Sequence, residues 1–292
     1  MLTVAQWNIE HDGGEDAKRW ELAHDVVRTY HPEVFLRQEM TRSHQYGHRR
    51  LHEAEHVLGL RGFITPATPE NQNATGLFLD PHMFNVDGVY PRTTLNWHPV
   101  CNVVAYLEDC PRPISFASFH LCFYDAETRL TEARRLTTLT KPGMVGLLGG
   151  DCNSYPRNPE PRTPLPDWDT VSDRAHMVHG TYLDPQGHRH SDTRPDTELT
   201  AAGYIDLARH AADHLGQPHA LAATAGHDKP EQGGPRRTDR AYAFGGLAAA
   251  LDSVEVIDTH ETRAVSKHSL VLYLFHEDRL RQLLKRTAAE AA

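Results

Sequence analysis

The stretch Leu147-Leu-Gly-Gly-Asp-Cys-Asn153 decides how the rest of this chain is interpreted. An apolar segment ends in two glycines and then presents Asp151 and Asn153, which are two residues apart, so both side chains point to one side of an extended backbone. A carboxylate and a carboxamide that project together can hold a phosphate or a hydrated Mg²⁺. Gly-Asp-x-Asn can also close an ordinary turn, so the motif needs support from elsewhere in the sequence.

Length and composition indicate an ordinary globular protein, with 292 residues of which 39% are hydrophobic and 24% are charged. We expect one domain over residues 1–292 rather than two smaller ones. The net charge of -9 argues against a protein that holds long nucleic acid on a basic surface. It leaves nuclease activity open, because bound divalent cations and a few local arginines can offset the field.

The cellular location is predicted from segments that the sequence lacks. No hydrophobic run is long enough to span a bilayer, and the first residues show no basic region followed by an apolar core. The cysteines Cys101, Cys110, Cys122 and Cys152 form no C-x-x-C pair, so a structural zinc site is not expected. We expect a cytoplasmic protein with reduced thiols and without a membrane or obligate protein partner, a Cys101–Cys110 bridge being the alternative.

Hydrophobic periodicity predicts strands and helices along most of the chain. Strands are expected at residues 2–9, 33–38, 62–66, 75–80, 86–90, 102–107, 114–119, 145–148, 238–244, 253–258 and 269–275. Helices are expected at residues 16–30, 44–58, 127–138 and 277–291. Proline-rich and glycine-rich stretches predict loop insertions near 154–200 and 221–236. Runs of consecutive strands with intervening helices predict an α/β fold of two sheets packed face to face with helices outside.

Polar residues flank six of these predicted strands. They are Asn8, Glu39, His120, Asp151, Asp239 and His268. Ligand-binding and catalytic groups commonly gather at strand ends, where loops give access and the sheet fixes position. Each residue alone has an ordinary explanation as a turn former, a helix-start acid or a strand-end polar group. Their joint occurrence indicates a site.

The motifs around these residues resemble, in the same order, those of the endonuclease/exonuclease/phosphatase superfamily. They are Trp7-Asn8-Ile9-Glu10, Arg37-Gln38-Glu39, Ser118-Phe119-His120-Leu121, Gly149-Gly-Asp-Cys-Asn153, Arg237-Thr-Asp-Arg240 and Ser266-Lys-His-Ser269. The resemblance covers nearly the whole chain. It implies a four-layered α/β/β/α sandwich of two packed mixed sheets, and hydrolysis of phosphoesters that depends on a divalent metal.

The resemblance also implies the metal site and the base. Glu39 would be the main metal ligand with Asn8 beside it, and oxygen ligands of this kind suit Mg²⁺ or Mn²⁺. Asp151 would orient or deprotonate the attacking water, and Asn153 would hold a phosphate oxygen.

Two histidines complete the implied catalytic set. His120 and His268 would bind the phosphoryl group and stabilise its developing charge, while Asp239 would support one of them or a second metal. The reaction would be an in-line displacement in which water attacks phosphorus.

One position departs from the family's pattern. The final motif is usually Ser-Asp-His, whereas this chain has Ser266-Lys267-His268. The missing acid normally fixes the histidine tautomer and favours its protonated form, which a lysine would disfavour. Three explanations stay open: Lys267 faces solvent while another acid such as Asp239 supports His268, Lys267 binds substrate phosphate, or the site binds without catalysis.

The substrate is less defined than the chemistry. Arg129 and Glu132 follow His120 at a spacing similar to the family's, so Arg129 is a candidate substrate-binding residue, with a solvated helix face as the alternative. The acidic chain and its extra loops favour a phosphodiester or phosphomonoester in a nucleotide, oligonucleotide or phosphorylated metabolite. An endonuclease for long DNA or RNA and a non-catalytic phosphate-binding or interaction module are the alternatives.

Overall fold

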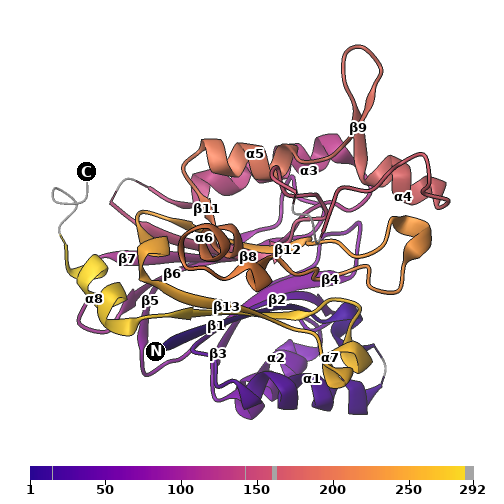
Figure 1. The fold of residues 1–292 in the computed structure, drawn as a ribbon. Helices are drawn as coiled ribbons and strands as arrows, with labels where there is room; N and C mark the ends of the chain where they lie inside the picture. The colour runs from indigo at the N-terminus through magenta and orange to yellow at the C-terminus, as the bar shows by residue number, and fades with distance from the viewer. Residues whose placement is uncertain (15, 142, 160–162, 287–292) are drawn as a thin grey trace.

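Two six-stranded mixed sheets lie face to face in the computed structural model, which describes residues 1–14, 16–141, 143–159 and 163–286 (Figure 1). The first sheet has the order β13-β14-β1-β2-β4-β3, with β1 Leu2–Asn8, β2 Val34–Thr41, β3 Arg61–Thr65, β4 Asn73–Leu79, β13 Leu251–Ile257 and β14 Leu270–Phe275. The second has the order β11-β12-β8-β7-β6-β5, with β5 Phe84–Arg92, β6 Val100–Leu107, β7 Pro113–His120, β8 Val145–Asp151, β11 Ile205–Asp206 and β12 Asp239–Phe244. In each sheet one central pair is parallel, β1 with β2 and β7 with β8.

Helices cover the outer faces of both sheets (Figure 1). The first sheet carries α1 Ala17–Thr29, α2 Arg49–Leu58 and α7 His260–Val265, and the second carries α3 Ala126–Leu136 and α5 Arg194–Ala201. The remaining elements are α4 Arg174–His179, the hairpin β9 Thr181–Leu183 and β10 Arg189–Ser191, α6 Leu207–His214 and α8 Glu277–Lys285. This is the expected α/β sandwich of four layers.

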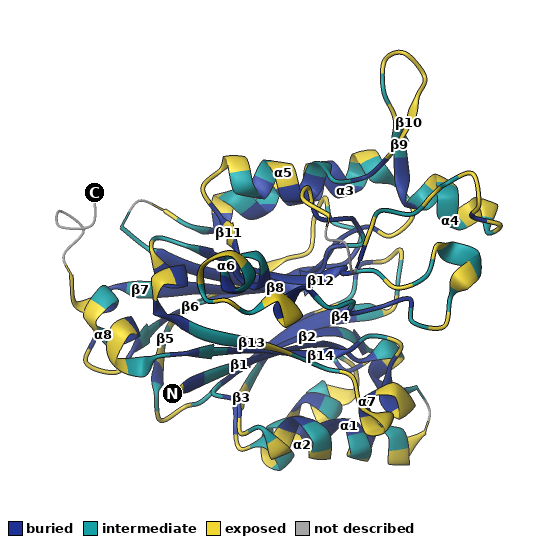
Figure 2. Ribbon diagram, viewed as in Figure 1, coloured by how far each residue is buried: buried dark blue, intermediate teal, exposed yellow. Residues whose placement is uncertain are grey.

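The alternation of side chains along β1 shows why apolar residues occupy both of its faces. Leu2 and Val4 pack into the core between the two sheets, whereas Ala5 and Trp7 pack into a second core shared with α1 and α2. A third core lies between the second sheet and α3. Because both faces of the central strands are buried, apolar residues predominate along them (Figure 2). Polar side chains inside these strands, such as Gln6 and Ser118, are buried, whereas the strand ends leave room for several polar groups to meet.

Three predictions about secondary structure need correction. The helix expected at 44–58 begins only at Arg49, because Gly47 and His48 have positive φ angles of 64° and 61° and end a short 3₁₀ turn. The insertion near 154–200 is more than a loop, since it contains α4, the β9–β10 hairpin and α5. The helix expected at 277–291 ends at Lys285, and its last residues, from 287 on, lie outside the described residues.

Two other expectations concern location and redox state. In the described part of the chain, no helix has the length and apolarity that crossing a bilayer requires. All four cysteines are buried free thiols, so the alternative of a Cys101–Cys110 bridge is wrong.

Candidate active site

The predicted polar residues meet at one end of the cleft between the two sheets. Asp151 ends β8 and is paired in register with His120 on β7 and with Asp239 on β12. Asn8 ends β1 in the opposite sheet, and its Nδ2 lies 3.3 Å from Oε1 of Glu39 and 3.3 Å from Oδ2 of Asp151. Asn8 therefore joins the residues of the two sheets into one site.

The two glycines before Asp151 allow β8 to pack closely on its neighbours. A Cβ atom on Gly149 would lie 2.7 Å from Leu36 and 2.9 Å from Gln6, both in the opposite sheet. A Cβ atom on Gly150 would overlap the carbonyl oxygen of Phe119 on β7. Any larger residue would have to push β8 away. The glycines of the motif thus set the position of the Asp151 carboxylate.

Glu39 enters the site through an irregularity in β2. Its φ is 56°, an unusual value for a non-glycine residue, and the register between β2 and β4 shifts between Arg37 and Met40. The bulge turns Glu39 toward Asn8. Its Oε2 accepts a hydrogen bond from the backbone N–H of His11 at 2.9 Å. A locally strained residue of this kind is typical of functional sites.

A carboxylate–histidine pair lies on the other side of Asp151. His268 Nδ1 is 2.9 Å from Oδ2 of Asp239, and His268 Nε2 is 3.8 Å from Oδ2 of Asp151. Burial alone would lower the pKa of His268, but the carboxylates of Asp239, Asp151 and Glu39 outweigh burial and raise it to about 10. His268 is therefore an imidazolium at neutral pH.

His120 has the opposite character. Burial, together with the nearby His268 and His11, lowers the pKa of His120 to about 3, so its ring is neutral. Its Nε2 lies 3.5 Å from Oδ2 of Asp151. The ring of His98 stacks on it with centroids 3.8 Å apart, and His98 is itself buried. The sequence analysis missed His98, because it precedes β6 in a stretch that carries no motif.

Asn153 lies beside Asp151 in a left-handed conformation, with φ of 45°. Its backbone N–H donates to Oδ1 of Asp151, and its Nδ2 donates to the carbonyl of Leu121, each at 2.9 Å. Both bonds fix the turn after β8, which places the Asn153 side chain on the wall of a hollow shared with His268.

Lys267 does not point at the histidine pair. Its Nζ forms an ion pair with Oε1 of Glu10 at 2.7 Å, and its side chain is 56% exposed. Asp239 supplies the carboxylate that supports His268. Of the three explanations for the altered motif, the geometry favours the first, in which the acid comes from β12.

Restoring the family's aspartate at position 267 should therefore give no large gain in catalytic rate. We expect Lys267→Asp to change kcat by less than about fivefold, because an exposed ion pair contributes roughly 1 kcal/mol or less. The change also places a carboxylate near Glu10. Steady-state hydrolysis by the two proteins, with Lys18→Asp at an exposed position on α1 as the control, measures this. A rise of a hundredfold would show that the missing acid limits the reaction.

The proposed substrate-binding role of Arg129 needs correction. Its side chain is fully buried and forms an ion pair with Asp192 at 2.9 Å. The guanidinium also donates to the carbonyls of Cys122 and His179, so it ties α3 to the segment that carries α4. Glu132 is buried too and accepts the backbone N–H groups of Trp97 and Cys122. Neither residue lies on a solvated helix face.

Arg129 should therefore matter for stability. Arg129→Met removes one of the two arginines that pair with the buried Asp192 carboxylate, Arg194 being the other, and we expect the unfolding free energy to fall by about 2–4 kcal/mol. Urea denaturation gives this value. Arg134→Met on the same helix removes a 58%-exposed arginine and should cost less than about 0.5 kcal/mol. Equal effects of the two changes would contradict the structural role.

The residues around Asn8 fit a hard divalent cation. Asn8 Oδ1 is buried and has no hydrogen-bond partner among the described residues, and the Glu39 carboxylate lies beside the amide. Oxygen donors of this kind suit Mg²⁺. Asp151, Asp239 and His268 form another group that could hold an ion, with ligand atoms within 4.8 Å of one another. Binding an ion at this group would require His268 to lose its proton, whereas Glu39 and Asn8 offer oxygen ligands without that cost, which favours the Glu39 side.

Comparisons with known proteins extend this description. No protein-family model and no curated protein sequence matches the chain. Solved structures of similar fold include TDP2 of D. rerio complexed with a single strand DNA product, with 15% identity, a TM-score of 0.61 and coverage of 94% of this chain and 98% of that one. A mannosyl-6-phosphatase of Bacteroides thetaiotaomicron has 13% identity and a TM-score of 0.62, with coverage of 94% and 100%. A protein of Leptotrichia buccalis described as of the endonuclease/exonuclease/phosphatase family has 11% identity and a TM-score of 0.63, with coverage of 94% and 100%.

Proposed function

We propose that this chain, which has the fold of endonuclease/exonuclease/phosphatase proteins, is a divalent-metal-dependent phosphoesterase. One observation carries the proposal. The buried carboxylate of Asp151 lies within 4 Å of three groups with different chemistry: the Asn8 amide, the neutral His120 and the charged His268. A base, a neutral donor and a cation around one point suit the transfer of a phosphoryl group to water.

The residues divide the chemistry as follows. Glu39 and Asn8 Oδ1 would hold Mg²⁺ or Mn²⁺, which supplies positive charge to a phosphate oxygen when bound. Asp151 accepts the proton of the attacking water as the water oxygen bonds to phosphorus and the P–O bond to the leaving group breaks, and the leaving oxygen takes a proton from solvent. The imidazolium of His268 donates from Nε2 to a phosphoryl oxygen, while Asp239 holds its Nδ1 proton. A neutral His120 with its proton on Nε2 donates a second hydrogen bond to the same group.

A small hollow lies next to His268, and its size favours a substrate with a compact group on one side of the phosphorus atom. Its volume is about 190 Å³, below the range usual for drug-sized ligands. The two expected insertions supply most of its wall, with His179 coming from α4 and Lys229 and Arg236 from residues 225–236. Lys267 lies at the same wall, although its nitrogen is paired with Glu10. The size and the cationic wall of this hollow fit part of a nucleotide or of a phosphorylated metabolite better than a long duplex.

A non-catalytic binding module is the second candidate function. The main argument for it was Lys267, which stands where the family has an aspartate. Because Asp239 contacts His268, the lysine in the Ser266-Lys267-His268 motif does not leave the histidine without a supporting acid. Catalysis is therefore the better proposal.

Glu39 gives a test that does not depend on knowing the substrate. We expect Glu39→Gln to weaken Mn²⁺ binding by at least about 10-fold, because a charged oxygen ligand becomes a neutral amide. Calorimetric titration measures binding, and hydrolysis of bis(p-nitrophenyl) phosphate with Mn²⁺ or chelator measures activity. Glu21→Gln, at an exposed position on α1, is the control. Unchanged Mn²⁺ affinity in Glu39→Gln would place the metal elsewhere.

A further inference from the structure

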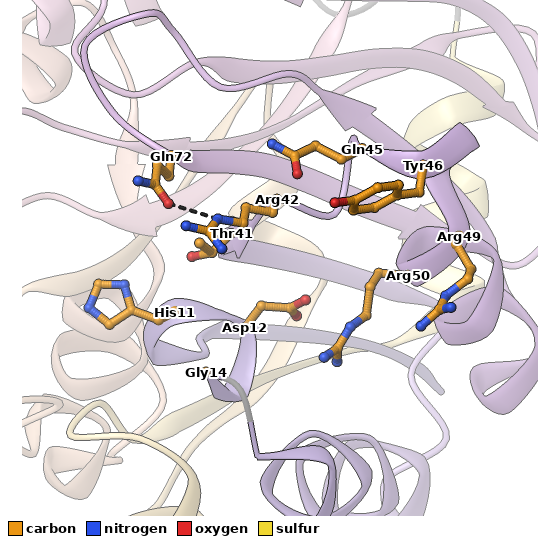
Figure 3. A pocket seen from close by; sticks show the side chains of 10 residues that line it. All are labelled: His11, Asp12, Gly14, Thr41, Arg42, Gln45, Tyr46, Arg49, Arg50 and Gln72. Atoms are coloured by element: carbon orange, nitrogen blue, oxygen red, sulfur yellow. Dashed lines mark hydrogen bonds between the residues drawn. The ribbon is translucent and has the colours of Figure 1, made fainter.

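A second and larger hollow begins on the other side of Glu39. Its volume is about 530 Å³, and it starts at His11 and Thr41 (Figure 3). His11 donates its backbone N–H to Oε2 of Glu39, and the Thr41 hydroxyl, which donates to Oδ1 of Asn73, lies 3.4 Å from the carbonyl oxygen of Glu39. His11 and Thr41 therefore join this hollow to Glu39, while His268 lines the smaller hollow. A substrate with groups on both sides of the phosphorus would occupy both.

The wall of this hollow is basic, although the whole chain carries a net charge of -9. Arg42, Arg49 and Arg50 line it, and of these Arg49 also pairs with Glu53 at 3.2 Å. The one carboxylate in the lining, Asp12, is already neutralised by its buried ion pair with Arg37. Three guanidinium groups around one hollow in an acidic protein favour an anionic ligand.

Two further features identify the kind of anion. The ring of Tyr46 lines the same hollow and is 90% exposed, so a large planar face is open to a ligand. The helix α2 begins at Arg49 with His48 as its N-cap, and no side chain caps its first N–H groups. Uncapped N–H groups beside arginines suit phosphate oxygens. An exposed ring beside phosphate-binding groups suits a base that stacks on it.

We infer that this hollow is a second binding site, which takes the nucleotide unit next to the scissile phosphate of a short single strand. The inference rests on the proposed phosphoesterase function and narrows its substrate to a diester. The phosphate of that unit lies among Arg42, Arg49 and Arg50, and its base stacks on Tyr46. The acidic remainder of the chain repels a long polyanion, which limits the strand to a few nucleotides.

Binding of a five-nucleotide thymidylate strand tests the site without hydrolysis. The strand carries fluorescein, the protein carries Asp151→Asn, and fluorescence anisotropy is followed with Mg²⁺ at several NaCl concentrations. Arg42→Gln and Arg50→Gln should each weaken binding, and each should reduce the slope of log affinity against log salt by about 0.7. Tyr46→Ala should weaken binding by about 10-fold or more, and Tyr46→Phe should restore it.

Two controls separate this inference from general charge and from folding. Arg134→Gln removes one exposed positive charge on α3, on the far side of the second sheet, and should leave the salt slope unchanged (Figure 1). Thermal melting checks Arg50→Gln, because Arg50 also lies 5.4 Å from the ring of Trp20. Arg42 contacts the exposed Gln72 side chain, so Arg42→Gln tests the site where folding is not at risk.

The possible results separate the second site from the phosphoesterase proposal. Hydrolysis of bis(p-nitrophenyl) phosphate by the wild-type chain is measured in parallel. If the wild-type chain hydrolyses the diester, and if Arg42→Gln, Arg50→Gln and Tyr46→Ala each leave strand binding unchanged, the second site alone is overturned. Strand binding that depends on these residues, without any hydrolysis, supports the second site and overturns the phosphoesterase proposal.

Discussion

Replacing Asp151 by asparagine is expected to lower kcat for phosphoester hydrolysis by about 10³- to 10⁴-fold. The amide has the same shape but cannot accept a proton from water at neutral pH. It also removes the negative charge that lies 3.8 Å from Nε2 of His268 and 3.5 Å from Nε2 of His120. Because the side chain is buried among polar partners, the new amide can still hydrogen-bond there, and the fold should persist.

The measurement is single-turnover hydrolysis of bis(p-nitrophenyl) phosphate by both proteins at saturating Mn²⁺. Circular dichroism and Mn²⁺ titration accompany it, so that loss of the base is separated from loss of the fold or of the metal. Asp169→Asn, at an exposed loop position, is the matched control and should keep full activity. Turnover by a pure Asp151→Asn preparation within tenfold of the wild type would refute the role of Asp151 as the base.

The strand ends explain how much of this site the sequence could reveal. A central strand buried on both faces is mostly apolar, so the residue at which the apolar run stops is visible without a structure. Asn8, His120 and Asp151 all stand at such points, and the structure brings their side chains together. The order of strands and helices predicted two packed sheets with helices outside, and the resemblance to the family implied the four-layered arrangement that the structure has.

Other features depend on contacts between distant segments and were not predictable in this way. The bulge that turns Glu39 inward comes from the pairing of β2 with β4, which no local pattern specifies. His98 reaches His120 from 22 residues away. Arg129 has the spacing of a substrate-binding residue, but its partner Asp192 belongs to an insertion whose path the sequence could not give. Side chains whose role depends on a non-local partner are therefore the ones that the sequence misassigned or missed.

The pH dependence of catalysis should reveal the pair of Asp239 and His268. The pKa of His268 is raised to about 10, so its cation is present at lower pH and is lost as the pH rises through that value. In Asp239→Asn the main stabilising carboxylate is gone, while burial and the charges of Asp151 and Glu39 remain and oppose each other, so we expect the pKa of His268 to fall to about its usual 6.5. At pH 8 the protonated fraction would be about 3%, so kcat/KM should fall by about 30-fold. Below pH 6 most of the activity should return.

The shape of the pH–activity profile distinguishes a lowered pKa of His268 from a general loss of structure. His120, with a pKa of about 3, stays neutral across the range and adds no limb above pH 5. A general loss of structure would lower activity at every pH, whereas loss of the carboxylate moves the basic limb toward acid. The partly exposed pair of Asp252 and His276, with Nε2 and Oδ1 2.6 Å apart, gives the matched control, and Asp252→Asn should leave the profile unchanged. If Asp239→Asn keeps the basic limb of the wild type, His268 is not the group that supplies positive charge to the phosphoryl oxygens.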